Sequence, residues 1–181
     1  MKKLLVGAAL SLAATGAWAD ATFSLSGSSG TANLASNAFF SATAAQLGLA
    51  SLPTVNIANL SVVGGPAQVT YTWLGSEAGF FDKAFAGNTS PASTLLFTTL
   101  GTSGAFAPCG SGCVSSAFSV GNGILPFQFL SPLGAAINGS NTLAEPDFGV
   151  FLTADLKTAY LFFNDNGSGP DKDFDDMIIK A

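Results

Sequence analysis

The acidic residues of this chain are unevenly distributed, and the largest group lies near residue 170. Charged residues make up only 9% of the sequence, yet five of its eleven acids fall between Asp165 and Asp176. Carboxylates this close together repel one another and raise one another's pKa values unless a cation or hydrogen-bond donors compensate. Calcium compensates well because it binds carboxylate, amide, backbone carbonyl and water oxygens. The segment therefore predicts a calcium site.

The candidate ligands precede an apolar C-terminal strand. The preferred set consists of four aspartates, and two further acids are second candidates: Asp171, Asp173, Asp175 and Asp176, then Asp165 and Glu77. Asp171, Asp173 and Asp175 have the spacing with which an EF-hand loop begins, but Asp176 stands where the turn glycine of that loop belongs. The alternative is a solvated acidic turn in which Lys172 offsets part of the charge.

The absence of histidine and arginine excludes several common kinds of catalytic site. The sequence contains no histidine, and its six basic residues are all lysines. Histidine-dependent triads, the usual catalytic zinc sites and arginine clamps for phosphate are therefore excluded. We expect no enzymatic activity. The less favoured alternative is a carboxylate-dependent glycoside hydrolase in which Glu77 or Glu145 pairs with an aspartate.

A carbohydrate-binding module is a second alternative. Tyr71, Trp73 or Tyr160 would stack on a sugar ring beside the calcium loop. Aromatic side chains on strands are more often part of the core, and sixteen phenylalanines filling a sandwich account for the aromatic content without a ligand.

Cys109 and Cys113 are the only cysteines, and they are separated by the residues Gly-Ser-Gly. We expect them to form a disulfide at the tip of a hairpin, because no third cysteine competes and an exported chain meets an oxidising compartment. A redox-active pair is disfavoured because the spacing is not CxxC.

These groups must be positioned by short strands. The chain is rich in Gly, Ser, Thr, Ala and Asn and lacks long helical periodicity, so it predicts an all-β fold, a two-sheet, jelly-roll-like sandwich of about eight to ten strands. The expected strands are residues 22–26, 55–63, 68–74, 80–85, 94–100, 114–120, 124–130, 148–153, 159–164 and 174–180. Residues 42–52 are the only helical candidate.

Hydrophobic patterning indicates which faces are buried. Val69, Tyr71 and Trp73 alternate with polar residues, which predicts one buried face and one wet face. By contrast, the apolar runs at residues 95–97 and 161–163 predict strands that are buried on both faces.

The N-terminus has the pattern of a signal peptide. Lys2 and Lys3 precede an apolar run, and Ala17 and Ala19 provide the small-residue site for cleavage before Asp20. We therefore expect a signal peptide at residues 1–19, a single secreted domain at residues 20–181, and no membrane span after cleavage. Losing two lysines changes the formal charge from −5 to −7, which disfavours nucleic acid as a partner.

Two motifs resemble a known family. Asp171, Asp173, Phe174, Asp175 and Asp176 match the acidic D-x-D-[FY]-[ND]-D strand entry of DUF4114-type domains, and residues 77–80 (Glu-Ala-Gly-Phe) resemble their E-A-G-[FY] element. The chain is similar to PEP-CTERM-associated secreted proteins of proteobacteria, but here without the sorting tail. The resemblance implies an extracellular β-sandwich with a calcium site and no established catalysis.

Together these features predict a secreted bacterial calcium-binding β-sandwich, extracellular or periplasmic, that acts as a structural, matrix or adhesive module. Its expected partners are extracellular polysaccharide or surface and matrix proteins, and its expected cofactor is Ca²⁺.

Overall fold

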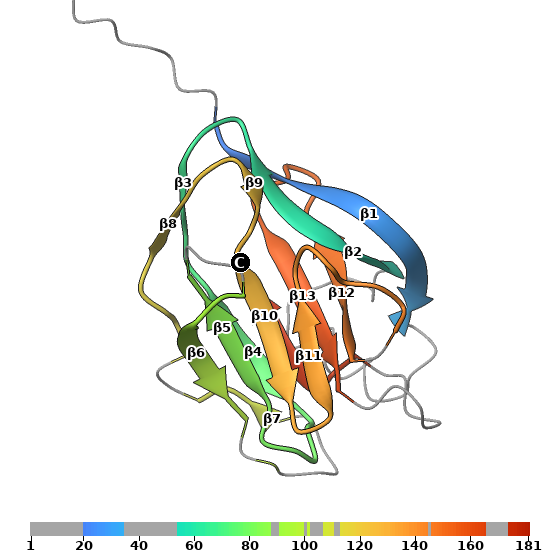
Figure 1. Cartoon of the computed structure of the whole chain (residues 1–181). Helices are drawn as coiled ribbons and strands as arrows, with labels where there is room; N and C mark the ends of the chain where they lie inside the picture. The colour runs from blue at the N-terminus through green and yellow to red at the C-terminus, as the bar shows by residue number, and fades with distance from the viewer. Residues whose placement is uncertain are drawn as a thin grey trace, which may run out of the picture.

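The computed structural model describes residues 20–34, 54–87, 91–99, 101, 107–110, 113–144, 146–165 and 174–181. These residues form fourteen antiparallel strands, most of which belong to two main layers (Figure 1). The first layer is an eight-stranded sheet in the order β1 (Thr22–Asn33), β2 (Thr54–Val63), β12 (Asp147–Leu152), β13 (Ala159–Asn164), β14 (Met177–Lys180), β4 (Thr72–Ser76) and β7 (Ala107–Pro108), with β9 (Gly123–Ile124) paired to β2.

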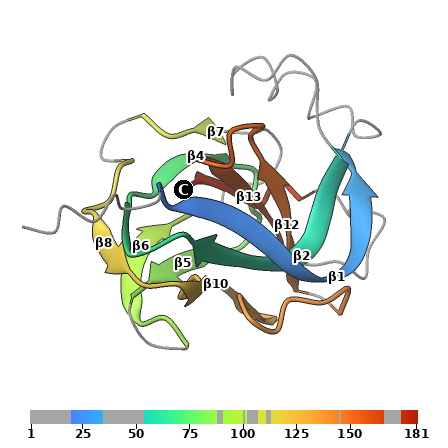
Figure 2. The same cartoon turned by 90° about the horizontal axis from the view of Figure 1, so that it is seen from above.

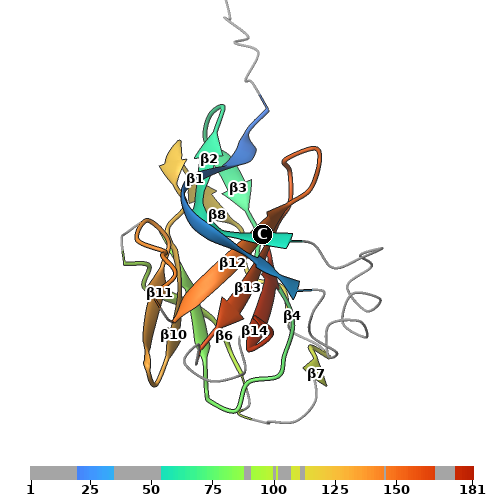
Figure 3. The ribbon, with the colours of Figure 1, turned by 90° about the vertical axis from the view of Figure 1, so that its right-hand side faces the viewer.

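The second layer is a four-stranded sheet that packs across the first, as Figures 2 and 3 show from two further directions. Its order is β11 (Gly134–Ile137), β10 (Phe127–Ser131), β5 (Lys83–Ala86) and β6 (Thr94–Thr98). A small two-stranded sheet pairs β3 (Ala67–Val69) with β8 (Phe118–Val120). The predicted all-β sandwich is confirmed. Among the described residues there is no helix long and apolar enough to cross a membrane.

There are more strands than the sequence predicted. The expected strands 68–74 and 124–130 are each divided in two, and β7 and β11 were not expected at all. Only β13 has the predicted bounds, because its six residues combine strong β-formers with turns at both ends. The helical candidate at residues 42–52 and the predicted signal peptide lie outside the described residues.

Phenylalanines fill the space between the two sheets. Phe127 and Phe129 from β10 face Phe148 and Phe163 from the larger sheet, and the rings of Phe129 and Phe163 stack with centroids 4.5 Å apart. A second apolar cluster covers part of the opposite face of the large sheet and includes Phe162. β13 is thus buried on both faces, as its continuous apolar run predicted.

The same prediction is wrong for residues 95–97. Leu95 is 53% exposed, because β6 is the edge strand of the four-stranded sheet. At the centre of the large sheet the packing is tighter. Gly149 lies against Val55 so closely that a Cβ atom there would overlap the valine side chain.

The disulfide between Cys109 and Cys113 is present, as expected, but it does not form a hairpin tip. The segment that carries it runs antiparallel along one strand, β4. Cys109 donates its N–H to the carbonyl of Leu74, and the N–H of Trp73 donates to the carbonyl of Cys113. The residues on either side of the disulfide therefore pair with the edge strand β4, whose backbone groups would otherwise be unpaired.

Two buried asparagines connect the layers at the turn after β11. Asn138 donates to the carbonyls of Leu60 and Leu125 and accepts from the N–H of Leu60, at 2.6–2.7 Å. Asn141 makes equivalent bonds to the backbone of Ala58 and Phe148. Both side chains are 3% exposed, so these amides act as internal substitutes for strand pairing.

Candidate metal centre

Three aspartates that are distant in sequence meet at one end of the sandwich. Asp82 directly precedes β5 in the four-stranded sheet, whereas Asp165 directly follows β13 and Asp176 directly precedes β14 in the eight-stranded sheet. One carboxylate oxygen from each lies within 4.8 Å of the others. We call these three residues the aspartate triad. It joins the two sheets of the sandwich.

Asp82 is held in place through its backbone. Its N–H donates to Thr99 Oγ1 at 2.8 Å, its carbonyl accepts from the Thr99 N–H at 2.9 Å, and the Thr99 hydroxyl donates to the carbonyl of Phe80. Thr99 is itself buried. The carboxylate is thereby fixed on the inner side of β5, in phase with the buried residues Ala84 and Ala86.

The other two aspartates are held by a hydrogen bond between the flanking strands. The N–H of Asp165 donates to Asp176 Oδ2 at 2.8 Å. Just before Asp176, Phe174 adopts φ 62°, a left-handed conformation that is unusual for a bulky residue and that interrupts the strand geometry. Local strain of this kind is concentrated at functional sites.

The carboxyl group of Asp82 has an unusual environment. The residue is fully buried, neither of its side-chain oxygens has an N–H donor among the described residues, and its side-chain partner is the carboxyl group of Asp165. Burial, followed by the charge and contact of Asp165 and the charge of Asp176, raises the pKa of Asp82 to about 9. Two carboxylates in contact have no proton to donate, so Asp82 and Asp165 require either a shared proton or a cation between them.

Only some of the ligands predicted from the sequence belong to the aspartate triad. Asp165 and Asp176 belong to the aspartate triad. Asp175 is fully buried next to it in the chain, and its carbonyl accepts the N–H of Glu77 at 2.9 Å, which brings the two predicted motifs into contact. Asp171 and Asp173 lie outside the described residues.

Asp82 was not among the predicted ligands. A signal was available, because Asp82 alternates with the apolar residues Phe80 and Ala84 on one face of the predicted strand 80–85. A polar residue in a buried position is more informative than an apolar one. A second buried polar pair lies beside the triad, where Asn164 Nδ2 donates to Asp147 Oδ1 at 2.9 Å.

The aspartate triad could hold a metal ion. Two oxygens bound to one Ca²⁺ at about 2.3–2.6 Å can be roughly 5 Å apart, which accommodates the observed spacing. The donors available are all oxygens, since the chain has no histidine and both cysteines are in the disulfide. Oxygen donors favour hard cations such as Ca²⁺, Mg²⁺ or Mn²⁺ over zinc or copper.

The aromatic residues of the carbohydrate alternative do not form a common platform. Tyr71 is fully buried and stacks on Phe127 with centroids 5.6 Å apart, so it cannot contact a sugar. Trp73 and Tyr160 are partly buried against Phe97 and Phe151. Glu145, one of the acids of the hydrolase alternative, lies outside the described residues.

The chain matches no protein-family model, no curated protein and no solved structure at a significant level. The resemblance to DUF4114-type domains therefore rests on the two motifs alone.

We expect the metal-free protein to lose stability as the pH rises. Asp82 has a folded-state pKa of about 9, above its ordinary value of 3.8, and the charged groups facing it are Asp165 and Asp176. Between these values the folded state binds more protons than the unfolded state, so the contribution of Asp82 is complete below about pH 4 and is lost by about pH 9.

Chemical denaturation in chelator from pH 4 to 9 measures this effect. In Asp82→Asn the corresponding part of the pH slope should be missing, while Asp20→Asn, which removes a 90% exposed carboxylate, should leave it unchanged. Identical slopes for all three proteins would show that Asp82 titrates normally.

Proposed function

We propose that this protein is a secreted calcium-binding β-sandwich that acts as a non-catalytic structural, matrix or adhesive module. The observation that carries the proposal is the buried carboxylate of Asp82, which has no N–H donor among the described residues and lies against the carboxylates of Asp165 and Asp176. An isolated buried carboxylate is unfavourable by several kcal/mol, whereas a divalent cation turns the same group into a ligand.

Calcium fits this site better than magnesium does. The triad offers up to three carboxylates, and the segment between Asp165 and Phe174 adds Asp171 and Asp173 in sequence. Ca²⁺ accepts many carboxylate ligands in irregular geometry, while Mg²⁺ demands an octahedron and usually retains several waters. Three carboxylates around one divalent ion also leave a residual charge of only −1.

The position of the triad supports a structural role. Its members come from both sheets, so the ion would tie the sheets together at one end of the sandwich. Asp82 is fully buried and Asp165 is 4% exposed, which suits an enclosed ion better than a polymeric substrate. Extracellular calcium modules commonly bind with Kd of about 10⁻⁴ to 10⁻³ M, so such an ion would be bound wherever calcium is millimolar.

Isothermal titration calorimetry on chelator-treated protein tests the proposal. One Ca²⁺ should bind per chain with a Kd at or below about 1 mM, and Mg²⁺ should bind more weakly. Asp82→Asn and Asp176→Asn should each abolish binding, whereas Asp20→Asn should not. If calcium does not bind at 10 times that concentration, or if it binds Asp82→Asn as well as the wild type, the site is an acidic turn that retains a proton.

The predicted loop ligands need a separate variant. Asp171→Asn combined with Asp173→Asn should weaken calcium binding without changing its stoichiometry, because the triad remains. Unchanged affinity would limit the site to the aspartate triad and to ligands other than these two carboxylates.

A further inference from the structure

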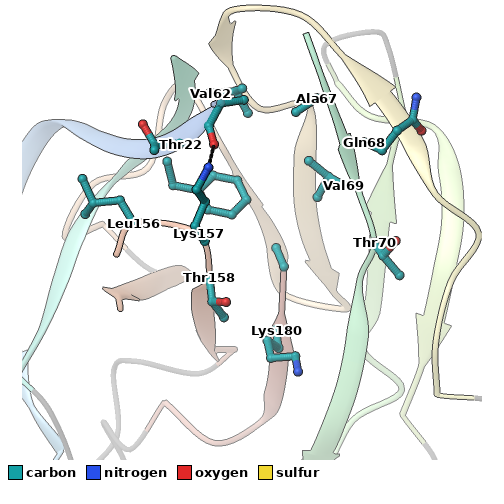
Figure 4. Close-up of a pocket in the computed structure, with 13 residues that line it drawn as sticks. Thr22, Val62, Ala67, Gln68, Val69, Thr70, Leu156, Lys157, Thr158 and Lys180 are labelled. Atoms are coloured by element: carbon teal, nitrogen blue, oxygen red, sulfur yellow. Dashed lines mark hydrogen bonds between the residues drawn. The ribbon is translucent and has the colours of Figure 1, made fainter. Parts of the chain in front are cut away.

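A pocket of about 340 Å³ lies beside the start of β1, as Figure 4 shows. Phe23 and Val69 belong to its apolar floor. The polar residues around it offer little to a ligand, because the side chain of Gln68 points away from the recess and Lys157 Nζ already donates to the carbonyl of Ala21 at 3.0 Å. The described lining of the pocket therefore lacks a set of polar side chains that would select a ligand.

The edges of the two main sheets are a second place where a partner could bind, because an edge strand presents unpaired N–H and C=O groups to another strand. Three of these edges are protected. In the large sheet, β1 has an irregular register between Ser26 and Gly30, and β7 is two residues long and contains Pro108. In the four-stranded sheet, β11 has only four residues, and the ring of Pro146 approaches Gly134 at its start. Short strands, bulges, prolines and covering segments all discourage strand addition.

β6 is the remaining edge of the four-stranded sheet, and its outer side is open (Figure 1). No described residue pairs with that side. The Thr99 N–H is bonded to the Asp82 carbonyl, toward β5, and successive residues of a strand direct their backbone groups to opposite sides, so the N–H and C=O of Thr98 point outward. β6 has one bulge, at Leu96, but it contains no charged residue and no proline, and Leu95 is 53% exposed.

The distribution of charge favours a second copy of this chain as the partner of the open edge. The chain has a formal charge of −5, so two copies repel each other at long range. The described residues of β5, β6 and the turn between them carry one charge, that of Lys83, and no acid, so two copies can meet at β6 without bringing carboxylates together. The edge is also self-complementary. About a twofold axis β6 runs antiparallel to itself, which places the apolar residues 95–97 of one copy opposite the same residues of the other.

We propose that β6 pairs with β6 of a second copy, so that the two four-stranded sheets form one continuous sheet of eight strands. Backbone hydrogen bonds at the edge provide the attraction. Leu95, Phe85 and Gln128 form a row across β6, β5 and β10 on the outer face of the sheet, and in the dimer this row continues into the second copy. A pair of five-residue strands buries less than about 1,200 Å², which is typical of weak complexes, so the expected Kd is about 10 µM to 1 mM. The proposal does not rest on the calcium site.

Analytical ultracentrifugation of the purified protein at about 5 µM to 1 mM tests the proposal. The weight-average mass should rise from that of the monomer toward twice that value. Hydrogen exchange measured at both ends of this range locates the contact. The outward N–H of Thr98 should become protected only at the high concentration, whereas the N–H of Thr99, which is bonded within one copy, should be protected at both. A protein that stays monomeric at about 1 mM would contradict the proposal.

Three variants distinguish edge pairing from packing of the sheet faces. Leu95→Lys places a charge on the edge, and Thr98→Pro removes an outward N–H, so each should raise the Kd at least about tenfold. Leu130→Lys adds the same charge to the same outer face, at a 36% exposed position on the interior strand β10, and should leave the Kd unchanged.

Circular dichroism checks that each variant is folded, and if Thr98→Pro is not, Leu95→Lys still decides the question. If Leu130→Lys weakens the dimer as much as Leu95→Lys does, the copies associate through the sheet face and the proposed edge pairing is wrong. It is equally wrong if Leu95→Lys dimerises like the wild type.

Discussion

Asp82→Asn should affect stability in opposite directions with and without calcium. In chelator the variant should be more stable than the wild type, because an amide replaces a buried acid whose charged form is repelled by Asp165 and Asp176. At a calcium concentration 100 times the Kd, the wild type should gain about 2.7 kcal/mol, which raises the melting temperature by about 5–10 °C for a domain of this size. The variant should gain none of this.

Differential scanning calorimetry of both proteins in calcium and in chelator measures the crossover. Asp20→Asn is the matched control, because it removes the same charge from a 90% exposed position at the other end of the molecule, and it should keep the full calcium shift. Equal melting temperatures for the wild type in calcium and chelator would contradict the calcium proposal. A calcium shift that persists in Asp82→Asn would move the site away from the aspartate triad.

Asn138→Ala should be among the most destabilising single substitutions in the protein. The side chain is 3% exposed and makes three hydrogen bonds to the backbone of Leu60 and Leu125. The Leu60 carbonyl keeps its bond from the Leu125 N–H, so truncation leaves two buried groups without partners, the Leu60 N–H and the Leu125 carbonyl. At about 1–3 kcal/mol each, the expected loss is about 2–6 kcal/mol.

Urea denaturation provides the measurement, and a second variant separates hydrogen bonding from cavity formation. Asn138→Asp keeps the shape but replaces two donated hydrogen bonds with a carboxylate that faces two carbonyls, so it should be at least as destabilising at neutral pH and less so in acid. Asn122→Ala, whose only described bond is to the exposed Gly65 N–H, is the control and should cost less than about 1 kcal/mol. A similarly small loss for Asn138→Ala would show that water replaces the amide.

The strand positions that were predictable from sequence are those where burial and β-propensity agree. Residues 159–164 are the clearest case, because Leu161, Phe162 and Phe163 pack into cores on both faces of the sheet. β11 was missed because its sequence, Gly-Ala-Ala-Ile, has weak β-propensity and forms a strand only through its pairing with β10. The polar turn that follows it, residues 138–141, gave no sign that Asn138 would be buried.

The candidate metal site was likewise predictable from the sequence only in part. The acidic cluster marked the region of Asp165 and Asp176, because like charges concentrated in an uncharged sequence require a local explanation. The third member, Asp82, is contributed by the opposing sheet, and which strands face each other across a sandwich is a property of the topology rather than of local sequence. Without that topology, Asp82 is one isolated acid at the start of a strand.

The location of the triad between two sheets also has a kinetic consequence. Its ligands come together only when β5 has docked against the ends of β13 and β14. We expect these contacts between segments far apart in the sequence to form late in folding, so an ion held there would stabilise the native state more than the transition state. Interactions absent from the transition state leave the folding rate unchanged and slow unfolding, here by up to about a hundredfold at the calcium concentration considered above. The lifetime of the native protein in the presence of proteases would then depend on the calcium concentration of its surroundings.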